Sequence, residues 1–200
     1  GAGPFHSQTN EAWFTKTPGL KVIYPAFPED AKGLLCAAIN DPNPVLFFEH
    51  KALYRSIYQD VSDDYFTVEI GKASVLNEGS DITIISYGAG VQWALDTLKK
   101  NPEISADLID LRTLQPLDVE TIYTSVRKTG KVIFLQEDSL FGSIASDVSA
   151  LITENCFEAL DAPVKRVASL ETPIPFQGEL EKQYLPKNRF VDELKKLLNY

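Results

Sequence analysis

Short apolar segments alternate with amphipathic segments along most of this 200-residue chain, and this alternation limits the folds it can adopt. The stretches DITIIS and KVIFLQED have the length of buried strands, and each is followed by a segment with helical periodicity. Strands that alternate with helices in this way are typical of parallel α/β domains. The pattern therefore predicts a doubly wound sheet of four or five strands interleaved with helices.

Apolar periodicity and turn residues give the bounds of the expected elements. Expected helices cover residues 10–16, 28–40, 119–128, 143–160 and 190–199, and a further helix follows the glycine turn at residues 88–90. Expected strands cover residues 21–24, 45–49, 67–73, 81–86, 106–110, 131–138 and 164–168. The pattern weakens between residues 51 and 80, so we interpret that stretch as a linker and divide the chain into residues 1–58 and 59–200.

The charge and the sparse cysteines exclude several classes of function. A net charge of -9 argues against nucleic acid or an anionic membrane as a partner. The apolar runs are far shorter than the roughly 20 residues that cross a membrane. Cys36 and Cys156 have no neighbouring ligands at metal-binding spacing, which argues against a disulfide framework or a zinc site. We therefore expect a soluble protein of the cytoplasm.

Several residue patterns that suggest chemistry have simpler interpretations. The turn SYGAGV resembles a phosphate-binding turn but lacks a complete GxGxxG pattern, so a tight turn between strand and helix is favoured. Glu137 and Asp138 end a strand where ligands of open sheets bind, yet adjacent strand residues point to opposite faces. They are expected to have a structural or interface role. His50 is expected at an exposed strand end, and Ser143 and Ser146 have no histidine nearby in sequence for a catalytic triad.

His6 precedes a polar helix start in the stretch GPFHSQTNEAWF. A histidine near the positive end of a helix can meet an anionic substrate and can exchange a proton near neutral pH. The residues alone leave a functional and a structural role for His6 open.

Five segments, taken in their order along the chain, resemble the beta subunit of thiamine-diphosphate-dependent 2-oxo acid dehydrogenases. They are GPFHSQTNEAWFTKTPGLKVIYPAFPEDAKGLL, INDPNPVLFFEHKALYR, GSDITIISYGAGV, DLRTLQPLD and EDSLFGSIASDV. The resemblance implies that residues 1–58 are the end of a pyrimidine-binding α/β domain. It implies that residues 59–200 are a linker and a transketolase-type carboxy-terminal domain, with three α/β/α layers and a mostly parallel sheet. EHKALYR favours branched-chain substrates such as 2-oxoisovalerate over pyruvate.

The resemblance also implies roles for particular residues. It places His6 in the active site, where the imidazole would orient the substrate carboxylate and donate a proton during reductive acylation of a lipoyl group. It places a potassium ion at Ala38, Ile39, Asp41 and Asn43, held partly through backbone carbonyls. A capped helix end followed by a proline turn explains these four residues equally well.

The partners that the resemblance implies are an alpha subunit or alpha-like half, a second beta subunit and a lipoyl-bearing acyltransferase core. Tyr200, and more weakly Glu171, are candidate contacts with that core, although a terminal helix packed on its own sheet is the alternative. Thiamine diphosphate and Mg²⁺ are expected to be held mainly by regions outside this chain. We therefore expect a fragment that is inactive alone, and whose strands before residue 51 lack sheet neighbours unless a second copy pairs with them.

Two rival functions stay open. A transketolase or deoxyxylulose phosphate synthase relative would share the domain, but Arg55, Arg112 and Arg127 form no obvious set for a sugar phosphate. A non-catalytic module for subunit assembly and core docking is the other.

Overall fold

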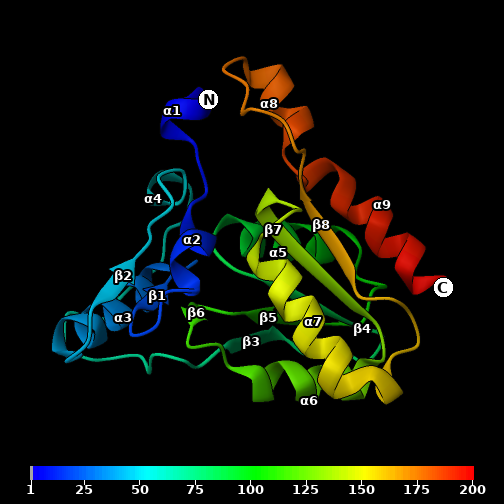
Figure 1. The fold of residues 1–200 in the computed structure, drawn as a ribbon, viewed down its shortest axis with the longest axis horizontal. Helices are drawn as coiled ribbons and strands as arrows, with labels where there is room; N and C mark the ends of the chain where they lie inside the picture. Colours follow the sequence, from blue (N-terminus) through cyan, green and yellow to red (C-terminus); the bar gives the residue numbers. More distant parts are fainter. Residues whose placement is uncertain (1) are drawn as a thin grey trace.

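The computed structural model describes residues 2–200, which form two β-sheets and the helices that cover them (Figure 1). The larger sheet has the strand order β3-β5-β4-β7-β8. Its strands are β3 (Ser74–Asn77), β4 (Ile82–Ser86), β5 (Ala106–Asp110), β7 (Val132–Ser139) and β8 (Lys165–Ser169). All neighbouring pairs are parallel except β3, which lies antiparallel to β5 at one edge. The predicted mostly parallel sheet is confirmed.

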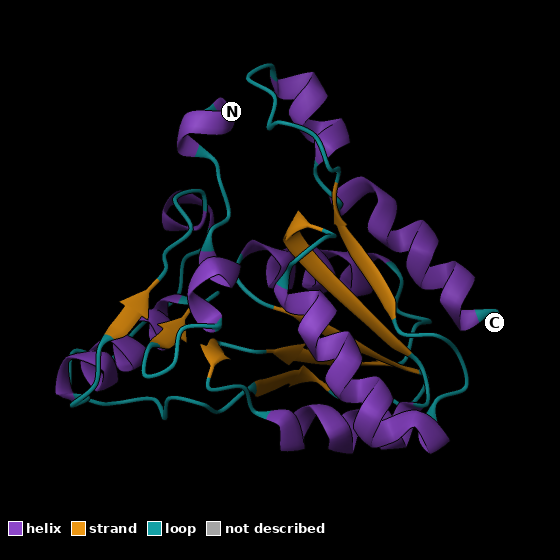
Figure 2. Cartoon of the chain, viewed as in Figure 1, coloured by secondary structure: helices purple, strands orange, loops and turns teal. Residues whose placement is uncertain are grey.

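Helices cover both faces of the larger sheet. These helices are α5 (Ala89–Lys100), α6 (Val119–Thr129), α7 (Ile144–Cys156) and α9 (Lys187–Leu198). Apolar residues of α5 and α9 share one core cluster with the sheet, while residues of α6 and α7 share the other. Figure 2 shows these helices in purple around the orange strands. Burying apolar side chains on both faces explains why β4 and β5 are buried along their whole length.

The amino-terminal part of the chain forms the smaller sheet, with the order β2-β1-β6. Its elements are α1 (Gly3–His6), α2 (Glu11–Thr15), β1 (Lys21–Ile23), α3 (Pro28–Asn40), β2 (Val45–Phe47) and α4 (Leu53–Ser56). Strand β6 (Thr113–Gln115) follows β5 in the sequence and pairs antiparallel with β1. The expectation that the early strands lack neighbours within the chain is therefore wrong, because the later half of the chain supplies one.

One core cluster contains residues from both parts of the chain. A row of aromatic contacts runs from Phe14 to Phe48, Tyr24, Tyr87 and Phe134, with ring centroids 5.5 to 6.3 Å apart. The two sheets are thus joined by packed apolar side chains as well as by the β1–β6 pairing. A division of the chain near residue 58 stays a prediction.

Other differences from the sequence-based elements have physical causes. Residues 67–73 form no strand, because their backbone groups bond elsewhere: the N–H of Val68 donates to the carbonyl of Gly33 (3.0 Å), and the N–H groups of Gly71 and Ala73 donate to the side chains of Thr113 and Asp118. The strand of this region, β3, begins at Ser74. The expected helix over residues 143–160 ends at Cys156 and continues as a short 3₁₀ helix, Phe157–Ala159. Helix α8 (Gly178–Tyr184) and the short elements α1, α4 and β6 were not predicted. None of the helices within residues 2–200 has the length and apolarity to cross a membrane.

Candidate active site

His6 is the last residue of the single-turn helix α1, and its side chain is exposed. Its imidazole has no hydrogen-bond partner within residues 2–200. An exposed, unengaged imidazole is free to contact a substrate and to exchange protons with it. The structure therefore leaves His6 available for the role that the sequence suggests.

The backbone on each side of His6 is attached to the part of the chain that carries the larger sheet. On one side, Gly3 is buried against the ring of Phe176, and the rings of Phe5 and Phe176 lie 6.3 Å apart. On the other side, Thr9 Oγ1 donates to Asp138 Oδ1 (3.0 Å) at the end of β7. Helix α1 and the segment before α8 lie at the same end of the molecule (Figure 1).

A hydrogen bond joins His50 and Glu137 at the carboxyl end of β7. His50 Nε2 lies 2.8 Å from Glu137 Oε2, and the backbone N–H of Ala52 donates to His50 Nδ1 (3.2 Å). The His50 side chain is only 18% exposed, so the expectation of an exposed strand-end histidine is wrong. Burial lowers the pKa of His50, but the bond to Glu137 and its negative charge outweigh that effect and raise the pKa overall.

Glu137 and Asp138 face different partners, as expected for adjacent residues of a strand. Glu137 contacts His50 and Asp138 contacts Thr9, and both partners belong to the amino-terminal part of the chain. Burial raises the pKa of Asp138 above its ordinary value. The end of β7 thus holds the two parts of the molecule together through polar contacts.

Glu11 is a buried acid that sequence reasoning did not single out. Its side chain is almost fully buried at the start of α2, and its Oε1 accepts a hydrogen bond from the Tyr87 hydroxyl (2.8 Å). Burial raises the pKa of Glu11 to about 7, and the charges of Asp138 and Glu137 contribute to the rise. We call Glu11, Glu137 and Asp138 the carboxylate cluster. Glu11 is the glutamate in HSQTNEAWF and lies only five residues after His6, and this proximity in sequence was the available indication that Glu11 belongs to the candidate site.

The four residues expected around a potassium ion lie together at the carboxyl end of α3. The N–H of Asp41 donates to the carbonyl of Ala38 (3.3 Å), and the Asp41 carboxylate accepts from Asn43 N and Nδ2 (2.9 and 3.0 Å). Lys21 Nζ donates to the same carboxylate and holds the pKa of Asp41 at about 2. These bonds are those of a capped helix end. Within residues 2–200, no group of three or more His, Cys, Asp or Glu side chains could hold a metal ion.

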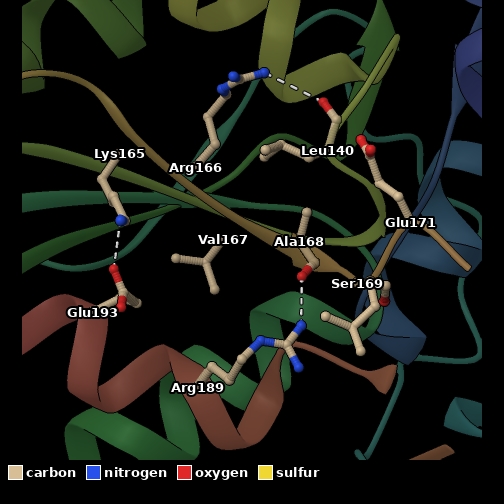
Figure 3. Close-up of a pocket in the computed structure, with 10 residues that line it drawn as sticks. Leu140, Lys165, Arg166, Val167, Ala168, Ser169, Glu171, Arg189 and Glu193 are labelled. Atoms are coloured by element: carbon tan, nitrogen blue, oxygen red, sulfur yellow. Dashed lines mark hydrogen bonds and ion pairs between the residues drawn. The ribbon is translucent and has the colours of Figure 1, made fainter. Parts of the chain in front are cut away.

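The two candidate docking residues lie in different pockets. Glu171 accepts a hydrogen bond from the N–H of Phe141 (2.9 Å) and lines a pocket of about 370 Å³ (Figure 3). Tyr200, which is 74% exposed, follows α9 and lines a second pocket together with Phe157 and Asp161. The structure therefore does not bring Glu171 and Tyr200 into one site.

The cations that line the pocket in Figure 3 are already engaged within the chain. Lys165 pairs with Glu193 (2.5 Å), and Arg189 donates to the carbonyl of Ala168 (2.8 Å). Arg166 donates to Ser146 Oγ (2.7 Å). Glu193 neutralises Lys165, whereas Arg166 and Arg189 donate to neutral oxygens and keep their positive charge. These bonds hold the three side chains in place within the chain, and the surroundings of His6 are the candidate site that the sequence also indicates.

The fold and these positions agree with two family models. Residues 71–191 match the transketolase C-terminal domain, and residues 2–56 match the transketolase pyrimidine binding domain. The chain therefore belongs to the transketolase C-terminal domain family.

Individual proteins similar to this chain include beta subunits of 2-oxo acid dehydrogenases. The chain is 45% identical, over 99% of its length, to the mitochondrial 2-oxoisovalerate dehydrogenase subunit beta 2 of Arabidopsis thaliana. It is 48% identical over 90% of its length to the 2-oxoisovalerate dehydrogenase subunit beta of Bacillus subtilis. The pyruvate dehydrogenase E1 component subunit beta of the same bacterium is 46% identical over 94%. The chain spans 56 to 58% of the length of these three relatives.

A solved structure supports the same relationship. The inactive beta4 tetramer of a split-gene transketolase superposes with a TM-score of 0.77 at 27% identity, covering 95% of this chain and 61% of that one. The resemblance to 2-oxo acid dehydrogenase beta subunits and the predicted fold class are therefore confirmed.

Proposed function

We propose that this chain forms part of the thiamine-diphosphate-dependent component of a 2-oxo acid dehydrogenase complex. The reaction is the oxidative decarboxylation of a 2-oxo acid, with reductive acylation of a lipoyl group. The observation that carries the proposal is the 44 to 48% identity to three 2-oxoisovalerate dehydrogenase beta subunits over at least 90% of this chain. Those relatives favour a branched-chain substrate, while the pyruvate dehydrogenase subunit at 46% keeps pyruvate as the alternative.

His6 is the residue that we assign to the chemistry. Its exposed imidazole at the end of α1 can orient the substrate carboxylate and donate a proton as the acyl group is transferred. The carboxylate cluster lies near the end of β7 and next to the loop that carries His6. Glu11 follows His6 by five residues, and Asp138 accepts a hydrogen bond from Thr9.

The described residues do not by themselves fit thiamine diphosphate with its Mg²⁺, because residues 2–200 contain no group of three acidic, histidine or cysteine side chains that could bind the ion. We therefore assign the cofactor to an alpha subunit or alpha-like half and to other parts of the beta subunit, including a second copy. This chain alone is then inactive, and calorimetry should detect no saturable binding of thiamine diphosphate to it. Stoichiometric binding would contradict this assignment.

Two further roles rest on the same proposal. A potassium ion would bind through backbone carbonyls of Ala38 and Ile39, with Asp41 and Asn43 beside them. Lys21 already neutralises the Asp41 carboxylate, so the carbonyls are the better ligands. A lipoyl-bearing acyltransferase core would contact Tyr200 after α9 and the region of Glu171, which lie in separate pockets.

The test uses the complete protein together with its alpha partner, thiamine diphosphate and Mg²⁺. Decarboxylation of pyruvate and of branched-chain 2-oxo acids is measured with an artificial electron acceptor, and acylation is measured on a lipoyl domain. We expect preference for the branched-chain acids and a large loss of acylation in His6→Ala. Because His6 is exposed and makes no hydrogen bond within residues 2–200, the substitution should leave the unfolding midpoint unchanged.

Two results would overturn the proposal. Activity on sugar phosphates but on no 2-oxo acid would favour a transketolase or deoxyxylulose phosphate synthase relative. An absence of activity on either class, with intact binding to the acyltransferase core, would favour an assembly and docking module. Equal losses of activity and stability in His6→Ala would remove His6 from the chemistry.

A further inference from the structure

We propose that Asp138 and Phe176 are positioning residues for His6, and that they fix the backbone on the two sides of that histidine. The inference rests on the proposed function, in which His6 acts on the substrate. Gly3 and Phe5 contact Phe176 before His6, and Thr9 contacts Asp138 after it. The segment 59–200 thus sets the place of an acid that the segment 1–58 carries.

The first attachment is a close packing contact. Gly3 has a positive φ of 62° and is buried, and a Cβ atom added there would lie 2.3 Å from the Phe176 ring. The residue must therefore be glycine for the ring to approach so closely. The rings of Phe5 and Phe176 then meet at 6.3 Å in a tilted arrangement. Phe176 belongs to the segment between β8 and α8.

The second attachment is a hydrogen bond from a neutral donor to a carboxylate. Thr9 Oγ1 donates to Asp138 Oδ1 (3.0 Å), and the same oxygen accepts the N–H of Ser139 (2.7 Å). The Ser139 bond holds the Asp138 carboxylate against the backbone of β7, so its acceptor atom has a fixed position. A bond to an ionised acceptor is stronger than one between neutral groups.

Between these attachments the loop is held mainly by itself. Gln8 Nε2 donates to the carbonyl of Pro4 (2.6 Å), and the N–H of Ala2 donates to Ser7 Oγ (3.2 Å), so both bonds lie inside the segment. They stiffen the turn around His6 without placing it on the rest of the molecule. Its place is therefore set by Phe176 on one side and by Asp138 on the other.

A proton donor works only within a narrow range of positions, and a misplacement of about 1 Å can cost about a hundredfold in rate. Releasing one attachment should therefore lower kcat by about ten- to a hundredfold. The KM for the 2-oxo acid should change less, because most of the substrate site lies on other groups. Asn in place of Asp138 keeps an oxygen acceptor for Thr9, so Asp138→Asn should retain activity that Asp138→Ala loses.

The experiment combines kinetics and nuclear magnetic resonance. Thr9→Val, Asp138→Ala, Asp138→Asn, Phe176→Ala and Phe176→Tyr are compared in the complete enzyme, with Thr153→Val as a matched control. Thr153 is exposed on α7 and its hydroxyl bonds only the carbonyl of Ser149 within its own helix. In the 200-residue chain, which has two histidines, histidine-selective labelling reports His6 directly once His50→Gln has assigned the signals.

We expect Thr9→Val, Asp138→Ala and Phe176→Ala to lower kcat and to change the His6 signal, whereas Asp138→Asn, Phe176→Tyr and Thr153→Val do neither. Wild-type kcat and an unchanged His6 signal in Thr9→Val would overturn the inference. Equal losses in Asp138→Asn and Asp138→Ala would overturn the role of Asp138 as an acceptor. If His6→Ala keeps full activity, the proposed role of His6 in the chemistry fails, and the His6 signal alone then decides whether the two attachments position the loop.

Discussion

The two sheets of this molecule are stabilised in different ways. The larger sheet is enclosed by helices on both faces, and its strands β4 and β5 are buried throughout. In the smaller sheet, β2 is only half-buried along its length and forms a free edge beyond β1. The smaller sheet also takes its third strand, β6, from the later half of the chain. The comparison indicates that the segment 1–58 folds on the segment 59–200 and depends on it.

One helix from each part, α6 and α3, shows a similar contrast. Helix α6 begins with a side-chain cap, in which Asp118 accepts from the N–H of Thr121 (3.3 Å), and ends at Gly130 in the left-handed conformation with φ of 68°. Helix α3 begins at Pro28 and has no side-chain cap hydrogen bond. Local signals therefore define α6 more completely, while α3 relies more on packing against its neighbours.

Separating the two parts should have the largest effect. We expect residues 59–200 expressed alone to unfold cooperatively, and residues 1–58 alone to show no cooperative transition, because the latter lose β6 and the shared core cluster. Circular dichroism during thermal unfolding and the dispersion of amide resonances measure both. Mixing the two pieces is the control, and it should restore dispersed signals for residues 1–58. A folded, cooperative 1–58 piece would break the comparison.

Two buried phenylalanines, Phe134 on β7 and Phe190 on α9, test how far the smaller sheet depends on the larger one. Phe134 lies in the core cluster that both parts share, whereas Phe190 lies in the cluster formed by the later part alone. Both rings are fully buried, so Phe134→Ala and Phe190→Ala should each lower the free energy of unfolding by about 3 to 5 kcal/mol. Only Phe134→Ala should selectively speed amide hydrogen exchange in β1. Similar exchange in β1 for both variants would show that the two clusters act as one unit.

The buried acid of the smaller part predicts a pH dependence. The pKa of Glu11 rises from 4.5 to about 7 in the folded state, mainly through burial, so folding favours its protonated form. Its contribution to stability is full below pH 4.5 and is lost as the pH rises through 7. Glu11→Gln keeps an acceptor for Tyr87 and should be more stable than the wild type above pH 7, by up to about 3 kcal/mol.

Urea unfolding at pH 5 and at pH 8 measures this difference. Glu154→Gln, on the exposed face of α7, is the matched control and should change stability little at either pH. If Glu11→Gln and the wild type are equally stable at pH 5 and at pH 8, then Glu11 is ionised in the folded protein throughout this pH range.

The sequence predicted the elements whose signals are local. The helix over residues 28–40 and the strand over residues 106–110 agree with α3 and β5 at both ends. Pro28 marks the start of α3, and the turn residues Asn101 and Pro102 precede β5. The β1–β6 pairing could not be predicted, since TLQ is short and its partner lies about ninety residues earlier. The strand expected at residues 67–73 is absent for a related reason, because its backbone groups bond residues distant in sequence, such as Gly33 and Asp118, in place of a neighbouring strand.

The candidate site was predictable only in part. His6 stands out through its motif, but its attachments at Asp138 and Phe176 lie well over one hundred residues away in sequence. The His50–Glu137 hydrogen bond likewise joins residues far apart in sequence, which is why His50 was expected at the surface. Periodicity reports which face of an element is buried but gives no information on such distant polar partners.

The smallest expected effect is that of a potassium ion at the carboxyl end of α3. It tests whether a bound ion stabilises the amino-terminal part of the chain independently of the larger sheet. If K⁺ binds the carbonyls of Ala38 and Ile39, then KCl at ten times its dissociation constant should stabilise the chain by about 1.4 kcal/mol relative to an equal concentration of tetramethylammonium chloride. Equal ionic strength cancels the screening of the Lys21–Asp41 pair, which would otherwise weaken with salt. Thermal unfolding in KCl and in tetramethylammonium chloride measures the difference in stability. Identical midpoints at every concentration would leave the bonds from Lys21 and Asn43 to Asp41 as the whole explanation of this helix end, and would strengthen the conclusion that the smaller sheet draws its stability from the larger one.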